Sequence, residues 1–91
     1  MAFATSNVRL ESIGSLFRMV GDFTSNVGDA DGTVAVGGKV YDKVFNDFSD
    51  TTPTTQPLPS KVSRNSTTGI STVTVNVSNG VTAGTFIIDY R

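Results

Sequence analysis

The stretch ISTVTVNVSNG, residues 70–80, constrains the fold more than any other part of the chain. Valines alternate there with polar residues: Val73, Val75 and Val77 with Thr72, Thr74 and Asn76. Successive side chains of a strand point to opposite faces, so this period of two predicts a strand with one buried face. Valine and threonine have branched Cβ atoms, which pack better on a pleated sheet than on a helix.

Similar patterns recur between turn signals along the rest of the chain, and we expect strands within residues 7–14, 15–24, 33–38, 61–69 and 85–91. In residues 7–14, Val8 and Leu10 alternate with Arg9 and Glu11, which predicts a half-buried strand. Glu11 is the only glutamate, so residues that favour helices are scarce. The sequence therefore predicts one all-β domain over residues 1–91, a small antiparallel β-sandwich or jelly-roll-like barrel of roughly seven strands.

Residues 39–48 carry two competing patterns. Their apolar residues, Val40, Tyr41, Val44, Phe45 and Phe48, fall at helical spacing. Aromatic and β-branched residues and the preceding Gly37 and Gly38 favour a strand instead. We expect a strand, with Val40, Val44 and Phe48 on one face. Tyr41 and Phe45 would then share the other face, which a neighbouring chain could cover.

Two segments without alternation are expected to make contacts. Residues 1–7 form a short N-terminal arm that carries Phe3, and residues 49–59, SDTTPTTQPLP, form a loop that contains all three prolines. The alternative for this loop is a solvated crossover between strands. The residues that we expect to contact partners are Phe3, Pro57, Leu58, Pro59, Tyr90 and Arg91.

The size of the chain favours association with other chains. A domain of 91 residues buries only about 60–65% of its unfolded surface, so it has little stability to spare. The chain has no cysteine, which excludes disulfides and thiolate zinc sites. Partner chains are the remaining support, and the aromatic residues Phe17, Tyr41 and Phe45 could be buried between protomers.

Charge and hydropathy indicate which partners to expect. The net charge is −1 and the isoelectric point is near 5.0, so no basic surface for nucleic acid is expected. No run approaches the roughly 20 apolar residues of a membrane helix. The start MAFATSNVRL lacks the charged and apolar regions of a signal peptide, and we therefore expect synthesis and assembly in a cytoplasm.

The stretch GDADGT, residues 28–33, is the nearest approach to a ligand site, with Asp29 and Asp31 as candidate calcium ligands. A calcium loop of the EF-hand type needs an oxygen ligand at its fifth position and a bidentate glutamate at its twelfth. Counting from Asp29, Thr33 holds the fifth position and Val40 the twelfth. We expect a turn between strands, with a weak calcium site as the alternative, and no cofactor.

Nothing in the sequence predicts catalysis. There is no histidine, so a Ser-His-Asp triad cannot form, and there is no G-x-S-x-G motif. Asp42, Asp47 and Asp50 could resemble a pair of glycosidase acids, but such a pair needs a dry cleft. A chain of this length has little volume for one after its core is filled. We expect no catalytic residues and no enzymatic activity.

Several segments together resemble small β-rich structural proteins of tailed bacteriophages. They are MAFATSNVR at the start, GSL at 14–16, GDFT at 21–24, GDADGTVAVGG at 28–38, VYDKVF at 40–45 and, within 72–91, TVTV and GVTAGTFIIDYR. The resemblance implies a virion part, of which the capsid decoration or cement type matches best in size. It implies binding to the major capsid protein on the capsid surface, as a homotrimer, with no defining site motif to carry over.

Two other functions remain open from the residues. One is a different virion component, such as a surface knob, a fibre segment or a tail accessory protein. The other is a glycan- or calcium-binding β-module. The chain has no tryptophan, the residue that stacks best on sugars, which disfavours the glycan-binding module.

Overall fold

The computed structural model describes residues 3–26, 30–47, 58–77 and 81–91. All seven elements in these residues are strands, and each overlaps a segment that the sequence predicts as a strand. They are β1 (Ala4–Ile13), β2 (Leu16–Thr24), β3 (Asp31–Val36), β4 (Val40–Asp47), β5 (Ser60–Arg64), β6 (Ser71–Asn76) and β7 (Ala83–Tyr90). Among the described residues, no helix is long and apolar enough to cross a membrane.

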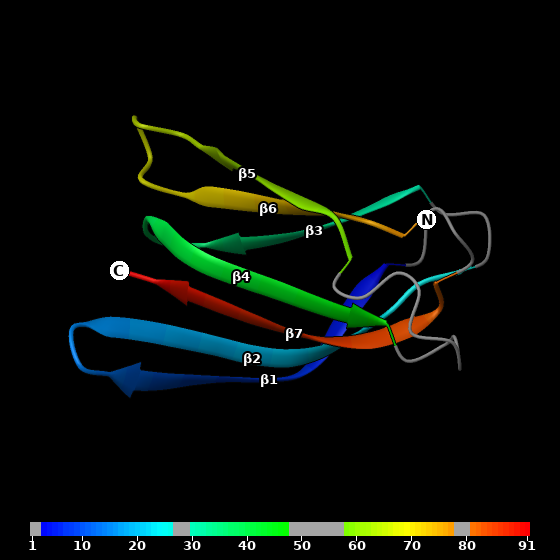
Figure 1. The fold of residues 1–91 in the computed structure, drawn as a ribbon. Coiled ribbons are helices and arrows are strands. Elements are labelled where there is room, and N and C mark those ends of the chain that lie inside the picture. The colour runs from blue at the N-terminus through cyan, green and yellow to red at the C-terminus, as the bar shows by residue number, and fades with distance from the viewer. Residues whose placement is uncertain (1–2, 27–29, 48–57, 78–80) are drawn as a thin grey trace.

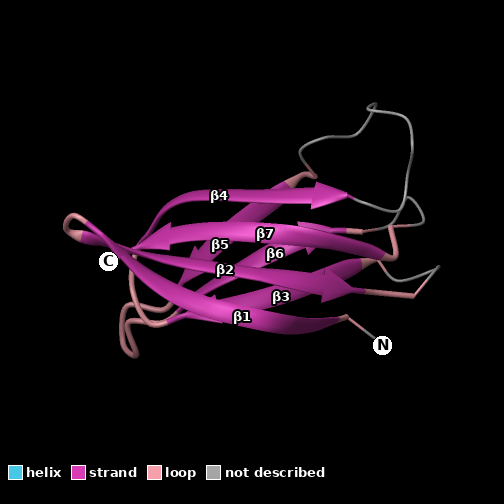
Figure 2. Ribbon diagram, turned by 90° about the horizontal axis from the view of Figure 1, so that it is seen from below, coloured by secondary structure: helices cyan, strands magenta, loops and turns pink. Residues whose placement is uncertain are grey.

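The strands form two antiparallel sheets that pack face to face (Figure 1). One sheet has four strands in the order β1-β2-β7-β4, and the other has three in the order β3-β6-β5. Viewed from below, the four-stranded sheet lies in front of the three-stranded one (Figure 2). The prediction of a small antiparallel β-sandwich is confirmed.

The core lies between the sheets and follows the period of two. Val73 and Val75 of β6 are fully buried, whereas the neighbouring Thr72 and Thr74 are only half-buried. From the four-stranded sheet, Phe86 and Ile88 of β7 point to the same space and are also fully buried. The remaining core residues are Phe23, Val34, Val36, Phe45, Leu58, Val77 and Val81.

Strand β4 settles the conflict of residues 39–48 in favour of a strand, but the predicted faces were wrong. A register shift between Val40 and Asp42 marks a β-bulge, where one extra residue changes which side chains face inward. Val40 therefore packs against the core and Phe45 is fully buried, while Tyr41 stays exposed. No neighbouring chain is needed to cover Phe45. Phe48 lies outside the described residues.

The predicted N-terminal arm is wrong for residues 4–7, which belong to β1. Thr5 and Ser6 pair with Phe23 and Asp22 of β2, and the register then shifts between Ser6 and Arg9. At this shift Asn7 has a φ of 51°, in the left-handed region that asparagine tolerates better than most residues. Small polar residues carry no alternation, so the sequence did not indicate this part of the strand.

Candidate interaction surface

Strand β1 is the most exposed element of the fold. It lies at the edge of the four-stranded sheet, and among the described strands it pairs with β2 alone (Figure 2). All ten of its residues are exposed, so the strand predicted at residues 7–14 is present but is not half-buried as expected. An edge strand presents a row of backbone N–H and C=O groups that another strand can pair with.

The apolar residues of β1 face the side of the sheet where the core lies. Leu10 pairs with Met19, which packs against the core. A Cβ on Gly21 would lie 3.0 Å from Val8 Cγ2 and 2.8 Å from Phe86 Cζ, so Val8 also lies on the core side. Yet Leu10 keeps 60% of its surface exposed and Val8 keeps 45%.

The three-stranded sheet leaves the apolar side chains of β1 uncovered. Figure 1 shows β1 below β2, as the strand of its sheet that lies farthest from β3, β5 and β6. Phe17 of β2 is 48% exposed for the same reason, although its ring contacts that of Tyr90 at 5.8 Å between centroids. Val8, Leu10 and Phe17 form an uncovered apolar surface, which we call the β1 patch.

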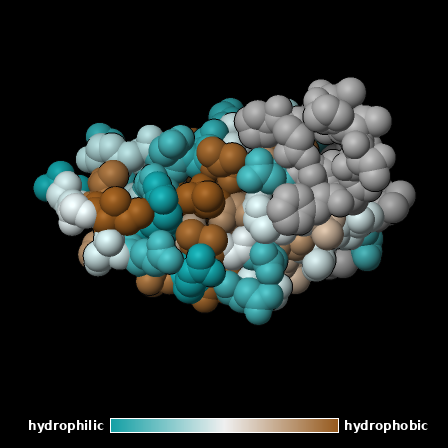
Figure 3. Space-filling view, turned by 60° about the horizontal axis from the view of Figure 1, so that its bottom comes forward, coloured by the Kyte–Doolittle hydropathy of each residue, from teal (hydrophilic) through white to brown (hydrophobic). Residues whose placement is uncertain are grey.

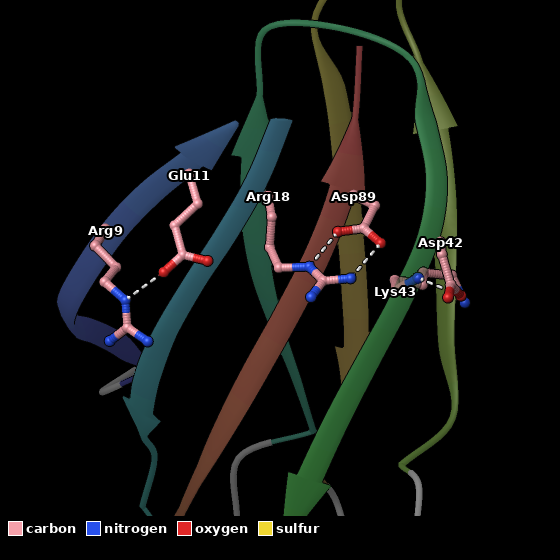
Figure 4. Close-up of polar contacts among 6 residues, drawn as sticks. All are labelled: Arg9, Glu11, Arg18, Asp42, Lys43 and Asp89. Atoms are coloured by element: carbon pink, nitrogen blue, oxygen red, sulfur yellow. Dashed lines mark hydrogen bonds and ion pairs between the residues drawn. The ribbon is translucent and has the colours of Figure 1, made fainter. Parts of the chain in front are cut away.

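The opposite, outer face of the four-stranded sheet carries charges in a row. Arg18 of β2 lies between Glu11 of β1 and Asp89 of β7. Its guanidinium donates two hydrogen bonds to Asp89, from Nε at 2.8 Å and from Nη2 at 3.1 Å (Figure 4). These bonds hold the pKa of the Asp89 carboxyl below its ordinary value and raise the pKa of Arg18. The arrangement fixes two neighbouring strands in register.

A second ion pair lies on β1 itself. Arg9 Nε is 3.0 Å from Glu11 Oε2, and both side chains point away from the core side (Figure 4). The two side chains remain 66% and 45% exposed, so this pair adds little to stability. It does place one charge of each sign along the free edge of the sheet.

An apolar row crosses the same outer face beside the charges. Val20 of β2 pairs with Ile87 of β7, and Ile87 pairs with Val44 of β4. All three are half-buried. Figure 3 shows apolar side chains gathered between polar ones on this face. We call Val20, Val44 and Ile87 the outer row.

The predicted contact residues do not form one surface. Phe3 is half-buried and stacks on Phe23 at 5.4 Å between ring centroids, whereas Tyr90 packs near the other end of the sandwich (Figure 1). Leu58 is wrong as a surface contact: it is only 6% exposed and belongs to the core. Its N–H donates to the carbonyl of Phe45, which holds it against β4.

The other predicted contacts have separate positions. Pro59 is exposed, and its carbonyl accepts a hydrogen bond from the Asn76 N–H. Arg91 is exposed at the end of β7 and exchanges backbone hydrogen bonds with Lys39. Pro57 and most of the loop 49–59 lie outside the described residues. The sequence predicted a strand at residues 7–14 but did not indicate it as a contact surface, because the alternation of Val8 and Leu10 with charged residues is the same in a half-buried strand and in an exposed edge strand.

Of the two candidate calcium ligands, the structure describes one. Asp29 lies outside the described residues, and Asp31 is exposed at the start of β3, opposite Asn76. Within the ranges that the structure describes, no three acidic side chains gather as metal ligands. Asp31 borders an open hollow of about 350 Å³, together with Pro59, Ser60, Lys61, Thr74 and Asn76. Tight calcium binding would need further oxygen ligands besides the Asp31 carboxylate.

Of the acidic residues considered as a catalytic pair, only Asp42 has a described side chain. Asp42 is exposed on β4, and its carboxylate accepts a hydrogen bond from the Lys43 N–H at 2.9 Å (Figure 4). Asp50 lies outside the described residues. The described strands therefore offer two apolar surfaces for contact, the β1 patch and the outer row.

Comparison of the chain with protein-family models, with curated proteins and with solved structures gave no significant match.

Proposed function

We propose that this chain is a non-enzymatic structural protein of a tailed-bacteriophage particle. Its role would be that of a capsid decoration or cement protein, which binds the major capsid protein at the capsid surface and stabilises the head. The resemblance of its strand and turn segments to small phage structural proteins supports the class. The observation that carries the role is the uncovered surface of the four-stranded sheet.

This sheet has two surfaces suited to protein contact. Its edge strand β1 exposes all ten residues, and its outer face carries Val20, Ile87 and Val44 in one row. Burying apolar surface contributes about 25 cal/mol per Å², so a modest contact becomes strong when it repeats across a lattice. A cement protein acts through such repeated contacts and needs no reacting group.

The outer row is the surface that we assign to the capsid. It is rimmed by the Arg18–Asp89 pair, whose charges satisfy each other and do not repel a partner of either sign. An apolar centre with a polar rim is the usual anatomy of a protein interface. The site of assembly would be the host cytoplasm, where capsids form.

Binding to capsids tests the proposal. The purified protein is mixed with expanded empty capsids of the phage that encodes it, and bound protein is measured by co-sedimentation. We expect saturable binding at a fixed ratio to the major capsid protein, and a higher temperature of capsid disruption. A folded protein that does not bind either capsids or particles would refute the decoration role.

Two variants locate the contact. Val44→Lys places a charge in the outer row, and we expect it to weaken capsid binding about tenfold or more. Ala35→Lys adds the same charge to an exposed position of β3 in the other sheet, and its binding should match wild type. Equal binding by both variants would contradict the assignment of the outer row. Binding to glycans in place of capsids would favour a fibre or receptor-binding role.

A further inference from the structure

The free edge of β1 is the least protected edge of the sandwich. The opposite edge of its sheet, β4, receives a hydrogen bond at the Phe45 carbonyl from the Leu58 N–H, and Lys43 Nζ reaches across to the Ser60 carbonyl at 3.1 Å. The edges of the other sheet, β3 and β5, have six and five residues. β1 has ten, and in the described part of the chain it pairs with β2 alone. Long uncovered edges of this kind are templates for another strand.

The residues of β1 are complementary to a second copy of themselves. We propose that two chains associate through antiparallel pairing of their β1 strands about a two-fold axis at Leu10. Each Arg9 then lies opposite the partner's Glu11, and each Glu11 lies opposite the partner's Arg9. Two cross-strand pairs of opposite charge form on the outer face. A two-fold interface of this kind is self-complementary by construction.

The charges select this register over its neighbours. A shift that places the axis at Arg9 puts two arginines directly opposite each other, and an axis at Glu11 does the same for two glutamates. Like charges directly opposite one another destabilise a strand pair. If the pairing shifted by one residue, the core side of one sheet would be continuous with the outer face of the other. With the axis at Leu10, no like charges lie opposite each other and the core sides of the two sheets coincide.

The apolar side chains gain from the same arrangement. Leu10 meets its own copy across the axis on the core side, where it now keeps 60% of its surface exposed. Val8 lies on the same side and flanks this contact, and Phe17 continues the surface onto β2. The β1 patches of two chains therefore join into one apolar surface, which explains why neither is covered within its own chain.

The register shift within β1 limits the segment that can pair with a second copy. The register of β1 against β2 shifts between Ser6 and Arg9, so the strand is regular from Arg9 to Ile13. A pairing centred on Leu10 uses the stretch from Val8 to Ser12, most of which follows this register shift. It joins two four-stranded sheets into one continuous sheet across the dimer. The inference does not depend on capsid binding, and it gives a dimer where the resemblance to decoration proteins implies a trimer.

Charge reversal tests both the surface and the register. Arg9→Glu leaves two acidic side chains on β1, and Glu11→Arg leaves two basic ones. We expect wild type to reach twice the 9.6 kDa mass of one chain by light scattering or sedimentation. Each single variant should self-associate about tenfold more weakly or worse, because both opposite-charge pairs become like-charge pairs. An equal mixture of the two variants should recover the dimer, since every pair is then of opposite charge.

The double variant R9E/E11R should also dimerise, because it exchanges the charges without changing their pairing. Lys61→Glu is the matched control for Arg9→Glu: it makes the same change in net charge at an exposed position of β5 and should dimerise as wild type does. Circular dichroism establishes that every variant is folded. A wild type that stays monomeric up to about 1 mM would overturn the inference, since that limit corresponds to about −4 kcal/mol. A stable trimer, or dimers that persist in both single variants, would overturn it as well.

Discussion

Phe3 connects the two sheets at one end of the sandwich, and its removal should destabilise the fold. The ring stacks on Phe23 of β2 with an interplanar angle of 22°. It also lies directly over Gly32 of β3, where a Cβ would overlap the ring. Gly32 is therefore required as the seat for Phe3, and the contact joins the first residues of the chain to both layers of the core.

The expected loss for Phe3→Ala follows from its burial. Replacing a fully buried phenylalanine by alanine costs about 3–5 kcal/mol. Phe3 is half-buried, which gives about 1.5–2.5 kcal/mol by proportion, including the aromatic pair. A loss of this size is a large part of the total stability of a domain of 91 residues, which is typically about 5–10 kcal/mol.

Urea unfolding followed by circular dichroism measures this loss. Tyr41→Ala is the control, because Tyr41 is an exposed aromatic residue whose ring contacts only the Lys39 amine among the described aromatic and cation–π pairs, at 5.4 Å. We expect the control to lose less than about 1 kcal/mol. A Phe3→Ala variant as stable as wild type would refute the structural role, and would return Phe3 to the set of residues available to a partner.

Three further results are expected. Hydrogen bonds from Arg18 lower the pKa of Asp89, so the stabilisation that Asp89 contributes is fully present above the ordinary value of 3.8 and is lost as pH falls through the lower folded pKa. In Asp89→Asn, the free energy of unfolding should therefore depend less on pH in that range. Gly84→Ala should lower the free energy of unfolding in urea by about 2 kcal/mol or more, because a Cβ would overlap a backbone carbonyl of β4. Gly37→Ala is the control, since a Cβ there meets open space, and it should cost less than about 1 kcal/mol. Equal losses in the two variants would contradict the packing around Gly84. Excess calcium should leave the melting temperature unchanged in wild type and in Asp31→Asn, and a rise abolished by Asp31→Asn would contradict the interpretation of GDADGT as a turn.

The class of fold could be predicted because its signal is local. The alternating valines of β6 and the paired aromatic and aliphatic residues of β7 determine their own buried faces, whatever their neighbours are. Strand β4 shows where this fails. A single extra residue near Tyr41 reverses the face to which the preceding side chains point. Nothing in the sequence marks the position of that bulge.

The candidate surface was harder to predict, because exposure depends on sheet order. Val8 and Leu10 alternate with charged residues as in a half-buried strand, and they do face the core side. They stay exposed because β1 lies at the edge of a four-stranded sheet under a three-stranded one. Leu58 shows the reverse case: it is flanked by prolines, as in a solvated loop, yet it is held in the core by a hydrogen bond to β4.

Amide hydrogen exchange in β1, measured by NMR at low and at high protein concentration, tests most directly whether this edge is an assembly surface. The account predicts that amides of residues 8–12 that point away from β2 exchange quickly at low concentration and slow down as the concentration rises. Amides at the edges of β3 and β5 should exchange at the same rate in both samples. Exchange in β1 that does not depend on concentration, or slowing at another edge, would contradict it.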